Sequence, residues 1–406
     1  MPIEKSNCTI PVKSKRLATS FRTIAVVVPK YGLIGGGEKF VLELTERIAA
    51  CERYHVHVFA NQWKKRSDKI TFHKVPIITF PKFLTTVSFA WFVKKKMQKI
   101  NFDLIHTHER IFDADICTLH SVPHFFWVSE IRKKRKSLFD YSTIWVERRF
   151  IERGTCKMFL PVSSITEKRF LQEFSISRNN IRTIHPGVDF DRFETLERSQ
   201  CRCSVRQRYG LSGSDIVMLF VGMNFELKGL DTLIAAISSA KRDNAHKTLK
   251  LLVAGKGNEK KYRKISEKFG IAEDVIFAGL VEKNIEELYL ASDMFSMLSR
   301  FDTFGMTALE AMAASLPVII SNNVGAKDLI KDNYNGFVVD LQEVDAIGKK
   351  IGILLNDNVR ERMAEEAKKT ARENTWDQMA GKVLAVYDQM LGLQSDDSEK
   401  ENHLKR

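Results

Sequence analysis

The segment FDTFGMTALEAMAASLPVII, residues 301–320, places two carboxylates eight positions apart, Asp302 and Glu310. Between them lies Gly305, and a run of strong helix formers follows it. Glycine lets a ligand approach the backbone closely, and the free N–H groups at the start of a helix bind phosphate. The segment therefore predicts a loop that leads into a helix whose N-terminus faces a phosphate-bearing ligand.

The two acids suit different parts of a nucleotide sugar. Glu310 lies one or two turns into the predicted helix, where it is expected to accept hydrogen bonds from the two vicinal hydroxyls of a ribose. Asp302 precedes the helix, on the far side of the phosphates, where a second polyhydroxyl group fits. The spacing matches a ligand built of a sugar, a diphosphate and a ribose. An amphipathic helix with a solvent-exposed glutamate would show the same spacing.

A lysine is expected beside the diphosphate. The predicted strand 216–222 ends in Gly222, and Lys228 follows just before the next predicted helix. A cation at this position can stabilise a diphosphate leaving group, whereas an ordinary surface lysine is the alternative interpretation. Gly255 and Val281 end later predicted strands of the same half, so they are expected at the same edge of the sheet.

The first half has its own glycine-rich turn, GGGEKF, residues 35–40. A dinucleotide-binding G-x-G-x-x-G motif would have a third glycine where Phe40 stands. The next predicted strand, 54–62, also ends without the acid that would hold an adenine ribose, so NAD is disfavoured. We expect this loop, with Gly36 and Gly37, to bind a phosphate or an acceptor sugar.

These residues require two parallel sheets to position them. Apolar runs bounded by glycine or proline predict buried parallel strands, and helical segments separate them. The predicted strands are 23–32, 54–62, 102–108, 115–120, 157–163 and 181–187, then 216–222, 250–257, 274–281, 293–299, a short strand after Pro317, and 336–340. The pattern predicts an α/β protein with two Rossmann-like domains facing each other across a ligand-binding cleft.

A polar stretch between the two halves predicts the domain boundary. The predicted divisions are a flexible basic N-terminus at 1–21, an acceptor-binding domain at 22–195, a linker at 196–214, a nucleotide-sugar-binding domain at 215–391 and a disordered tail at 392–406. The last helix of the second domain is expected to pack back on the first.

The charge of the chain is uneven. Residues 1–200 hold 35 lysines and arginines against 20 acids, whereas residues 201–406 hold 29 against 30. Basic clusters at 93–99 and 132–136 lie beside apolar aromatic segments. This combination suits an anionic membrane face or a phosphorylated substrate, and a solvated basic surface is the alternative. No nucleic-acid-binding signature is present, so nucleic acid is not an expected partner.

The expected location is the cytoplasm, with peripheral attachment to the inner face of the cytoplasmic membrane. No apolar run of transmembrane length occurs, and the N-terminal segment lacks the apolar core of a signal peptide. Cys201 and Cys203 could form a redox pair or chelate a metal, although two free thiols are the preferred interpretation.

The sequence predicts neither a metal site nor a tightly bound cofactor. His106, His108, His120 and His124 cluster near predicted strand ends, but their spacing fits no known ligand pattern. The pair of acids at 113 and 115 resembles the Asp-x-Asp metal site of a different glycosyltransferase fold, and it occurs without the context of that fold.

Together these motifs resemble the retaining glycosyltransferases of family 4, which have the two-domain GT-B fold. Their hallmark, E-x7-E with F-G inside and then E-A-M-A-x-G-x-P-V, corresponds to residues 302–318. The segments HPGVDFDRF, KGLD, GGGEKF, DLIHTH and TLH also match, and the resemblance covers residues 22–391. Within the family, the basic first half and VGMNFELKGLD look most like lipopolysaccharide core glucosyltransferases.

The resemblance implies transfer of a hexose, with glucose from a UDP-sugar expected, to a glycan or glycolipid acceptor such as lipopolysaccharide core. It implies three catalytic residues: Lys228 stabilises the leaving diphosphate, Asp302 holds the transferred sugar, and His120 has an electrostatic or positioning role. The implied donor-binding residues are Gly36, Gly37, Gly222, Lys228, Gly255, Val281, Phe304, Gly305, Met306, Thr307 and Glu310.

The sequence departs from the family pattern in three respects. Asp302 stands for the first glutamate, Ser315 for a glycine, and Met223 and Asn224 where an arginine is frequent. Lys228 is therefore expected to bear more of the diphosphate charge, and donor choice can differ. Two other functions stay open from the sequence: a nucleotide-sugar epimerase of the same fold, and a sugar-binding homologue without activity.

Overall fold

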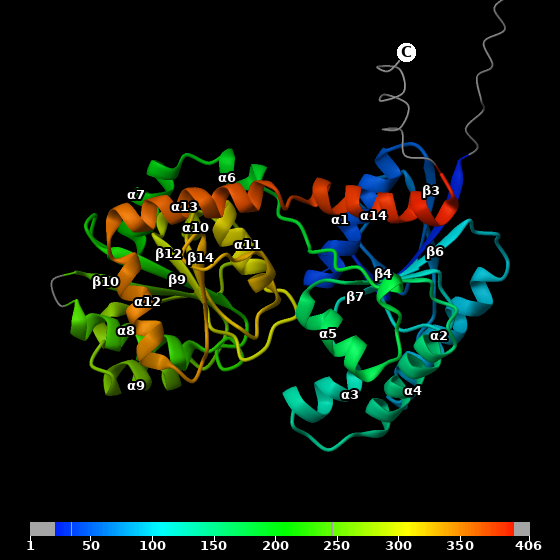
Figure 1. Ribbon diagram of the computed structural model, residues 1–406, viewed down its shortest axis with the longest axis horizontal. Coiled ribbons are helices and arrows are strands. Elements are labelled where there is room, and N and C mark those ends of the chain that lie inside the picture. The colour runs from blue at the N-terminus through cyan, green and yellow to red at the C-terminus, as the bar shows by residue number, and fades with distance from the viewer. Residues whose placement is uncertain (1–20, 34, 245–246, 394–406) are drawn as a thin grey trace, which may run out of the picture.

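A computed structural model describes residues 21–33, 35–244 and 247–393 of the chain (Figure 1). The described chain forms two α/β lobes that lie side by side, and the colour in Figure 1 changes from the blue-to-green N-terminal lobe to the green-to-orange C-terminal lobe. The predictions of a flexible N-terminus at 1–21 and a disordered tail at 392–406 concern residues that lie almost entirely outside the described ranges.

The N-terminal lobe is built on a parallel sheet in the order β5-β3-β1-β6-β7-β8. Its strands are β1 (Arg22–Val27), β3 (Tyr54–Ala60), β5 (Ile70–Lys74), β6 (Leu104–Thr107), β7 (Ile116–Leu119) and β8 (Met158–Pro161). A separate short pair joins β2 (Lys30–Tyr31) to β4 (Gln62–Trp63). The central strands are buried along most of their length because helices cover both faces of the sheet.

The helices of this lobe connect successive strands. They are α1 (Gly36–Ala50), α2 (Leu84–Met97), α3 (His124–Phe126) with the π-helical turn η1 (Trp127–Ile131), α4 (Leu138–Glu152), α5 (Ser164–Glu173) and the turn η2 (Arg178–Asn180). The short helix α6 (Asp191–Glu194) follows where the chain crosses over, and it lies on the C-terminal lobe (Figure 1). A capping box starts α4, in which the Ser137 hydroxyl accepts from the Asp140 N–H and the Asp140 carboxylate accepts from the Ser137 N–H.

The C-terminal lobe repeats the plan, with a parallel sheet in the order β11-β10-β9-β12-β13-β14. Its strands are β9 (Ile216–Gly222), β10 (Leu249–Gly255), β11 (Val275–Gly279), β12 (Met294–Met297), β13 (Val318–Ser321) and β14 (Gly336–Val339). In each sheet the first long strand of the lobe lies centrally, as in Rossmann folds, whose ligands bind at the carboxyl ends of the strands.

The helices of the C-terminal lobe cover both faces of this second sheet. They are α7 (Arg198–Tyr209), α8 (Leu230–Asp243), α9 (Glu259–Lys268), η3 (Ala272–Asp274), α10 (Ile285–Ala291), α11 (Met306–Ala313), η4 (Gly325–Leu329), α12 (Val344–Leu354) and α13 (Asp357–Arg372). The last helix, α14 (Trp376–Leu391), packs on the N-terminal lobe instead.

The final helix joins the two lobes. Figure 1 shows α13 over the C-terminal lobe and α14 beside α1 of the N-terminal lobe. Trp376, at the start of α14, packs edge-to-face on Phe40 with 6.1 Å between ring centroids. A Cβ atom at Gly187 would lie 2.3 Å from the Trp376 nitrogen, so only glycine permits this approach of the two crossing segments.

One predicted strand is wrong. Of the segment 181–187, only Ile181 pairs, and it does so as an isolated bridge with Phe159. The side chains that follow bond elsewhere, since the Thr183 hydroxyl donates to Glu167 at 2.5 Å and His185 pairs with Asp328 at 3.1 Å. The Arg182 and Ile184 N–H groups still donate to the Phe159 and Pro161 carbonyls of β8 at 2.9 Å, but the pairing does not extend into a regular strand.

The stretch 196–214, predicted to be a linker, contains the helix α7. Its polar composition reflects arginines that bind the C-terminal lobe, including Arg202 and Arg206, which pair with Asp293 at 2.8 and 2.9 Å. Because α7 packs against α10, it belongs structurally to the C-terminal lobe. The exact placement of the domain boundary stays a prediction.

Candidate active site

Lys228 and Asp302 form an ion pair at the carboxyl edge of the C-terminal sheet. Lys228 follows β9 and Asp302 follows the neighbouring strand β12, which explains how residues far apart in the sequence meet. Each side chain is only 20 % exposed. A Cβ atom at Gly222 would lie 2.8 Å from the Lys228 Cγ, so the glycine leaves room for the lysine against the end of β9.

The helix α11 begins beside this pair. Gly305 is its N-cap with φ of +92°, and a Cβ atom there would lie 2.7 Å from a Val324 methyl group. No side chain caps the helix, so N–H groups of its first turn, at Met306 and Thr307, have no side-chain acceptor at the cap. The Thr307 hydroxyl donates to the Met297 sulfur at 3.5 Å. This N-terminus favours an anion.

Glu310 lies where the two lobes meet. Its Oε2 accepts from the Tyr289 hydroxyl at 3.2 Å, and its Oε1 lies 3.8 Å from the Nζ of Lys39, on α1 of the other lobe. Burial, together with the nearby carboxylate, raises the pKa of Tyr289 well above its usual value, so this hydroxyl remains a donor at neutral pH. Tyr289 and Lys39 therefore hold the Glu310 carboxylate from both sides.

The glycine loop of the N-terminal lobe faces α11 and His120. A Cβ atom at Gly36 would lie 3.7 Å from the Met306 Cγ, and one at Gly37 would lie 3.3 Å from the His120 Cγ. The fold thus brings the predicted residues of the two halves together.

His120 follows β7 and bonds to a second histidine. Its Nε2 lies 2.9 Å from the Nδ1 of His108. Burial lowers the pKa of His120 to about 4 and that of His108 well below its usual value. Burial therefore favours the neutral form of both rings at pH 7, and the electrostatic or positioning role of His120 stays a prediction.

The remaining predicted residues line the same edge. Phe304 is buried, and its N–H donates to the Asp302 carboxylate at 3.1 Å. At Gly255, φ is +130° and a Cβ atom would lie 1.8 Å from the Gly222 carbonyl oxygen, so no other residue fits. Val281 follows the edge strand β11 and packs half-buried against the same core as Phe304.

Contacts between the lobes near this site were not predicted from the sequence. The Ser163 hydroxyl donates to the Thr303 carbonyl at 2.5 Å, and the Ser164 N–H donates to Asp328 at 2.6 Å. Burial alone would raise the pKa of Asp328, but hydrogen bonds from His185 and Ser164 lower it. These residues are far apart in the sequence, and no motif links them.

His106, His108 and His120 lie side by side, whereas His124 and the paired acids lie apart from them. The Nε2 of His124 lies 3.0 Å from the Oδ1 of Asp140, and the Asp113 carboxylate forms an ion pair with Lys94 at 2.7 Å. The Asp115 carboxylate accepts a backbone N–H of β6 at 2.9 Å. Within the described ranges no group of three or more His, Cys, Asp or Glu side chains is placed to hold a metal ion.

Two family models match the chain. The model described as Glycosyltransferase Family 4 matches residues 34–192, and the model described as Glycosyl transferases group 1 matches residues 203–370. One match lies in each lobe, and together they include every predicted site residue. The chain is a family 4 glycosyltransferase.

Curated relatives of this glycosyltransferase are diverse. An uncharacterised glycosyltransferase of Methanocaldococcus jannaschii is 26 % identical over 335 residues, 78 % of this chain and 84 % of the relative. The lipopolysaccharide glucosyltransferase WaaG of Escherichia coli is 24 % identical over 78 % of this chain and 84 % of the relative. Mannosylfructose-phosphate synthase of Agrobacterium fabrum is 28 % identical over 63 % of this chain, which spans 61 % of that enzyme. The shared property is glycosyl transfer, not one substrate.

Solved structures confirm the GT-B fold of this glycosyltransferase. The crystal structure of WaaG superposes with a TM-score of 0.72 and 20 % identity, covering 89 % of this chain and 99 % of WaaG. Anabaena HepE in complex with UDP and glucose superposes with a TM-score of 0.67 and 16 % identity, covering 91 % of this chain and all of HepE. The predicted architecture of two Rossmann-like domains is therefore correct.

Proposed function

We propose that this glycosyltransferase moves glucose from UDP-glucose to a glycan or glycolipid acceptor of the lipopolysaccharide core class, with retention of the anomeric configuration. The observation that carries the proposal is the Lys228–Asp302 pair beside the N-terminus of α11. A cation, free N–H groups and a carboxylate there match the phosphates and hydroxyls of a nucleotide sugar. The glucosyltransferase name of WaaG and the HepE complex with UDP and glucose support this choice of donor and acceptor.

The reaction breaks the bond between the anomeric carbon and the diphosphate oxygen, and the electron pair leaves with the diphosphate. Lys228 and the N–H groups of α11 stabilise that charge, and a single such group contributes roughly 10²–10³ in rate. Asp302 holds hydroxyls of the sugar as it becomes oxocarbenium-like. The acceptor hydroxyl attacks the same face, and its proton goes to an oxygen of the departing diphosphate.

The other residues position the donor. Glu310 accepts hydrogen bonds from the ribose hydroxyls, while Lys39 and Tyr289 hold its carboxylate in place. Neutral His120, which is hydrogen-bonded to His108, positions the transferred sugar next to the glycine loop. The donor is a substrate, and the proposed chemistry uses no tightly bound metal because the cation and the helix N-terminus take that role.

A donor screen tests this function. The protein is incubated with UDP-glucose and other nucleotide sugars, with and without a lipopolysaccharide core acceptor, and nucleotide release is followed. We expect release of UDP that depends on acceptor, and a product that keeps the α configuration of the donor by NMR. Interconversion of the donor sugar without acceptor would instead identify an epimerase, and donor binding without turnover a non-catalytic homologue.

We also propose that the face formed by α2 and α4 binds an anionic membrane. These helices pack together, and Trp91 and Trp145 on them are 49 % and 48 % exposed. The Lys95 ammonium lies 4.9 Å from the Trp91 ring centroid, and the Arg149 guanidinium lies 5.4 Å from that of Trp145. Aromatic side chains beside cations are typical of proteins at a charged lipid surface.

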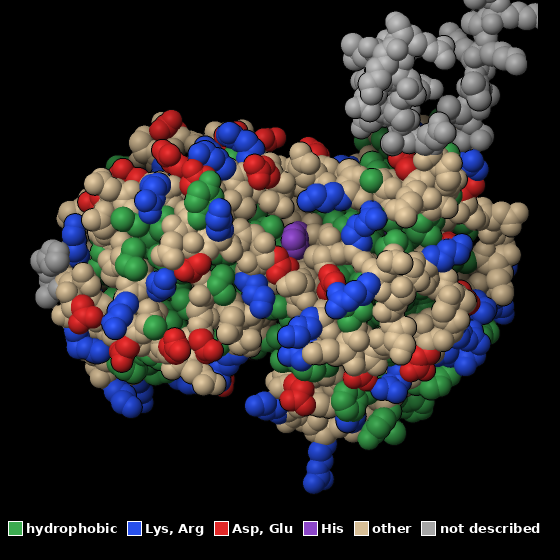
Figure 2. Space-filling view, in the orientation of Figure 1, with side chains coloured by type: hydrophobic (Ala, Val, Ile, Leu, Met, Phe, Trp, Pro, Cys, Tyr) green, Lys and Arg blue, Asp and Glu red, His purple; other side chains and the backbone are tan. Residues whose placement is uncertain are grey.

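Hydrophobic side chains with Lys and Arg neighbours gather at the lower right of Figure 2, over this part of the N-terminal lobe. Phe80 and Leu138, at the ends of the same helix pair, are 88 % and 70 % exposed. Of the helices in the described part of the chain, none combines the length and apolar character needed to traverse a bilayer. The proposal is therefore peripheral binding through this face.

A further inference from the structure

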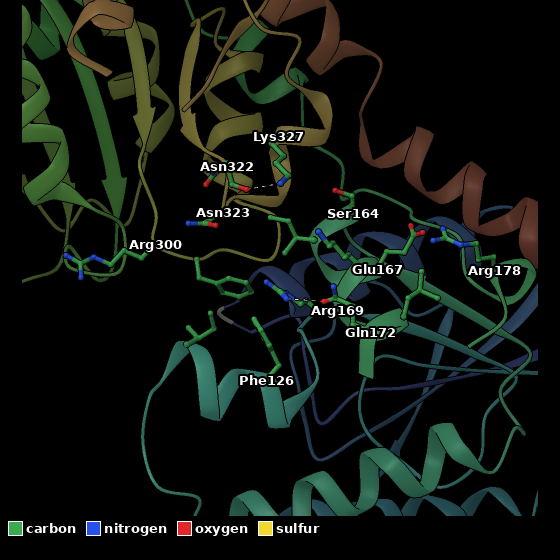
Figure 3. A pocket seen from close by; sticks show the side chains of 15 residues that line it. Phe126, Ser164, Glu167, Arg169, Gln172, Arg178, Arg300, Asn322, Asn323 and Lys327 are labelled. Atoms are coloured by element: carbon green, nitrogen blue, oxygen red, sulfur yellow. Dashed lines mark hydrogen bonds between the residues drawn. The ribbon is translucent and has the colours of Figure 1, made fainter. Parts of the chain in front are cut away.

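A cavity of about 850 Å³ opens between the lobes, beside the loop that carries Asp302 (Figure 3). One wall comes from α5 and from the α3–η1 segment of the N-terminal lobe. The facing wall comes from the loops that follow β12 and β13. None of the residues predicted to bind the donor lines this cavity, so it is a separate space within the same interlobe region.

The cavity is strongly cationic. Its charged lining residues are Lys168, Arg169, Arg178, Arg300 and Lys327, against the single carboxylate of Glu167. Among the described residues, only Arg300 of these five cations has a carboxylate partner, Asp231 at 2.8 Å. The Glu167 carboxylate accepts from the Thr183 hydroxyl at 2.5 Å.

The other cations have neutral partners or none that the structure describes. Figure 3 shows Arg169 directed at Phe126, with 4.2 Å between the guanidinium and the ring centroid. Lys327 donates to the Asn322 carbonyl at 2.8 Å. For Lys168 and Arg178, no hydrogen bond or ion pair joins the side chain to another described residue. The summed positive charge of these side chains attracts an anion into the cavity.

The cavity shares a wall with the proposed reaction centre. Phe301 lines it and directly precedes Asp302. Asn323 lines it as well, and its carbonyl accepts the Asp302 N–H at 3.0 Å. Ser164 lines the opposite side next to Ser163, whose hydroxyl donates to the Thr303 carbonyl at 2.5 Å. An occupant therefore lies against the loop that holds the transferred sugar in the proposed function.

We propose that this cavity is the acceptor site and that its cations select an acceptor sugar that carries a phosphate group. The inference rests on the proposed function, since it assigns the second substrate of the same reaction. Guanidinium and ammonium groups bind phosphate through charge-assisted hydrogen bonds. Phe126 and Phe301 add an apolar surface for a sugar ring, and the volume falls in the range of ordinary ligand sites.

Calorimetry with UDP present at saturation tests the proposal on the full chain. UDP occupies the proposed diphosphate site first, so that phosphate added later must bind elsewhere. Glucose and glucose 6-phosphate are then titrated as matched probes. We expect glucose 6-phosphate to bind the UDP-loaded protein at least about tenfold more tightly than glucose, as one or more charge-assisted hydrogen bonds would give.

The double variant Lys168→Gln/Lys327→Gln removes two of the cations. Because neither lysine forms an ion pair with a described residue, we expect the variant to fold, to keep its affinity for UDP and to lose most of the preference for glucose 6-phosphate. Lys264→Gln, on the exposed face of α9 and outside the cavity, is the matched control and should keep the preference. Thermal unfolding of the three proteins verifies their folding.

Two results would overturn the acceptor assignment but not the proposed function. They are equal affinity of the UDP-loaded protein for the two probes, and a preference for glucose 6-phosphate that the double variant retains. A parent protein that binds neither UDP nor another nucleoside diphosphate would contradict the proposed function, and the acceptor assignment with it. The first titration therefore separates the two failures.

Discussion

At the scale of single residues, Lys228 and Asp302 form an ion pair at the carboxyl edge of the C-terminal sheet. In the proposed function a bound diphosphate replaces the Asp302 carboxylate as the counterion of Lys228. This exchange would free Asp302 for sugar hydroxyls at the moment when Lys228 turns to the phosphates.

We expect Lys228→Ala to lower kcat by roughly 10²–10³, because a preorganised charge opposite the leaving group is lost. Steady-state UDP release with donor and acceptor at saturation measures this effect. Lys264→Ala is the control, since Lys264 is exposed on α9 and should leave the rate unchanged. A Lys228→Ala rate within a few-fold of the parent would contradict the proposed role.

The buried histidines make stability depend on pH. Burial lowers the pKa of His106 to about 3 and that of His120 to about 4, whereas an unfolded histidine titrates near its usual 6.5. The unfolded chain therefore binds more protons than the native one below about pH 6.5, and stability falls as the pH falls. At about 1.4 kcal/mol per pKa unit, His120 alone accounts for a loss of about 3 kcal/mol by pH 4.

Urea unfolding at pH 7.5, 6 and 5 measures this dependence. We expect the free energy of unfolding to drop steadily over this range, before carboxylates with a lowered pKa, such as Asp328, begin to contribute at lower pH. An unfolding free energy that is the same at pH 7.5 and pH 5 would show that these rings are not buried in the neutral form.

At the scale of elements, α11 has an unusual residue at its end. The Ser315 N–H donates to the Met312 carbonyl and the Leu316 N–H to the Ala311 carbonyl, both at 3.0 Å. This is a Schellman motif, whose C′ residue is usually glycine because φ is positive. Here Ser315 takes that place with φ of +61°, so the departure from the family pattern puts a strained serine where the turn favours glycine.

Ser315→Gly should raise the free energy of unfolding by about 0.5–1 kcal/mol, because glycine adopts this conformation without the Cβ penalty. The variant loses only a long hydrogen bond from the Ser315 hydroxyl to the Ala364 carbonyl, at 3.3 Å. Ser315→Ala is the control: it keeps the Cβ atom and should bring no gain. Chemical denaturation of the three proteins measures the difference, and a Ser315→Gly variant no more stable than Ser315→Ala would refute the explanation.

At the scale of the whole molecule, contacts beside the site and along α14 hold the described parts of the two lobes together. The Ser164–Asp328–His185 contacts join them beside the site, and α14 joins them through α1 and through a 2.7 Å hydrogen bond between Tyr387 and His106. Figure 2 shows Lys and Arg side chains on both sides of the line where the lobes meet. The α2–α4 face lies on the outer part of the N-terminal lobe, so membrane binding there would leave the interlobe region accessible.

Vesicle sedimentation tests the membrane proposal. We expect the protein to bind phosphatidylglycerol vesicles at low salt, to release them as salt rises, and to bind phosphatidylcholine weakly. Trp91→Ala/Trp145→Ala should reduce binding at least about fivefold, as loss of two interfacial aromatic anchors predicts. Phe269→Ala, an exposed aromatic residue of the other lobe, is the control. No binding to anionic vesicles at low salt would end the proposal.

The sequence by itself determined the two-lobe α/β plan and predicted most residues of the candidate site, because both depend on local patterns. Buried parallel strands appear in the sequence as apolar runs, and Gly222, Lys228 and Gly305 lie at or just after the ends of strands. The same reasoning missed β5, of which only Ile70 is fully buried, and read the polar helix α7 as a linker. Such elements lack the apolar signal since their stability comes from neighbours rather than from their own composition.

The tertiary structure alone decided which distant side chains meet. Lys39 reaches Glu310, Ser164 reaches Asp328, and cations from α5 face those that follow β12 and β13 across one cavity. No spacing in the chain predicts these contacts, because they form only when the two lobes pack against each other. The physical reason is that strand order and lobe packing depend on the sum of many long-range contacts, whereas a motif records only its own neighbourhood.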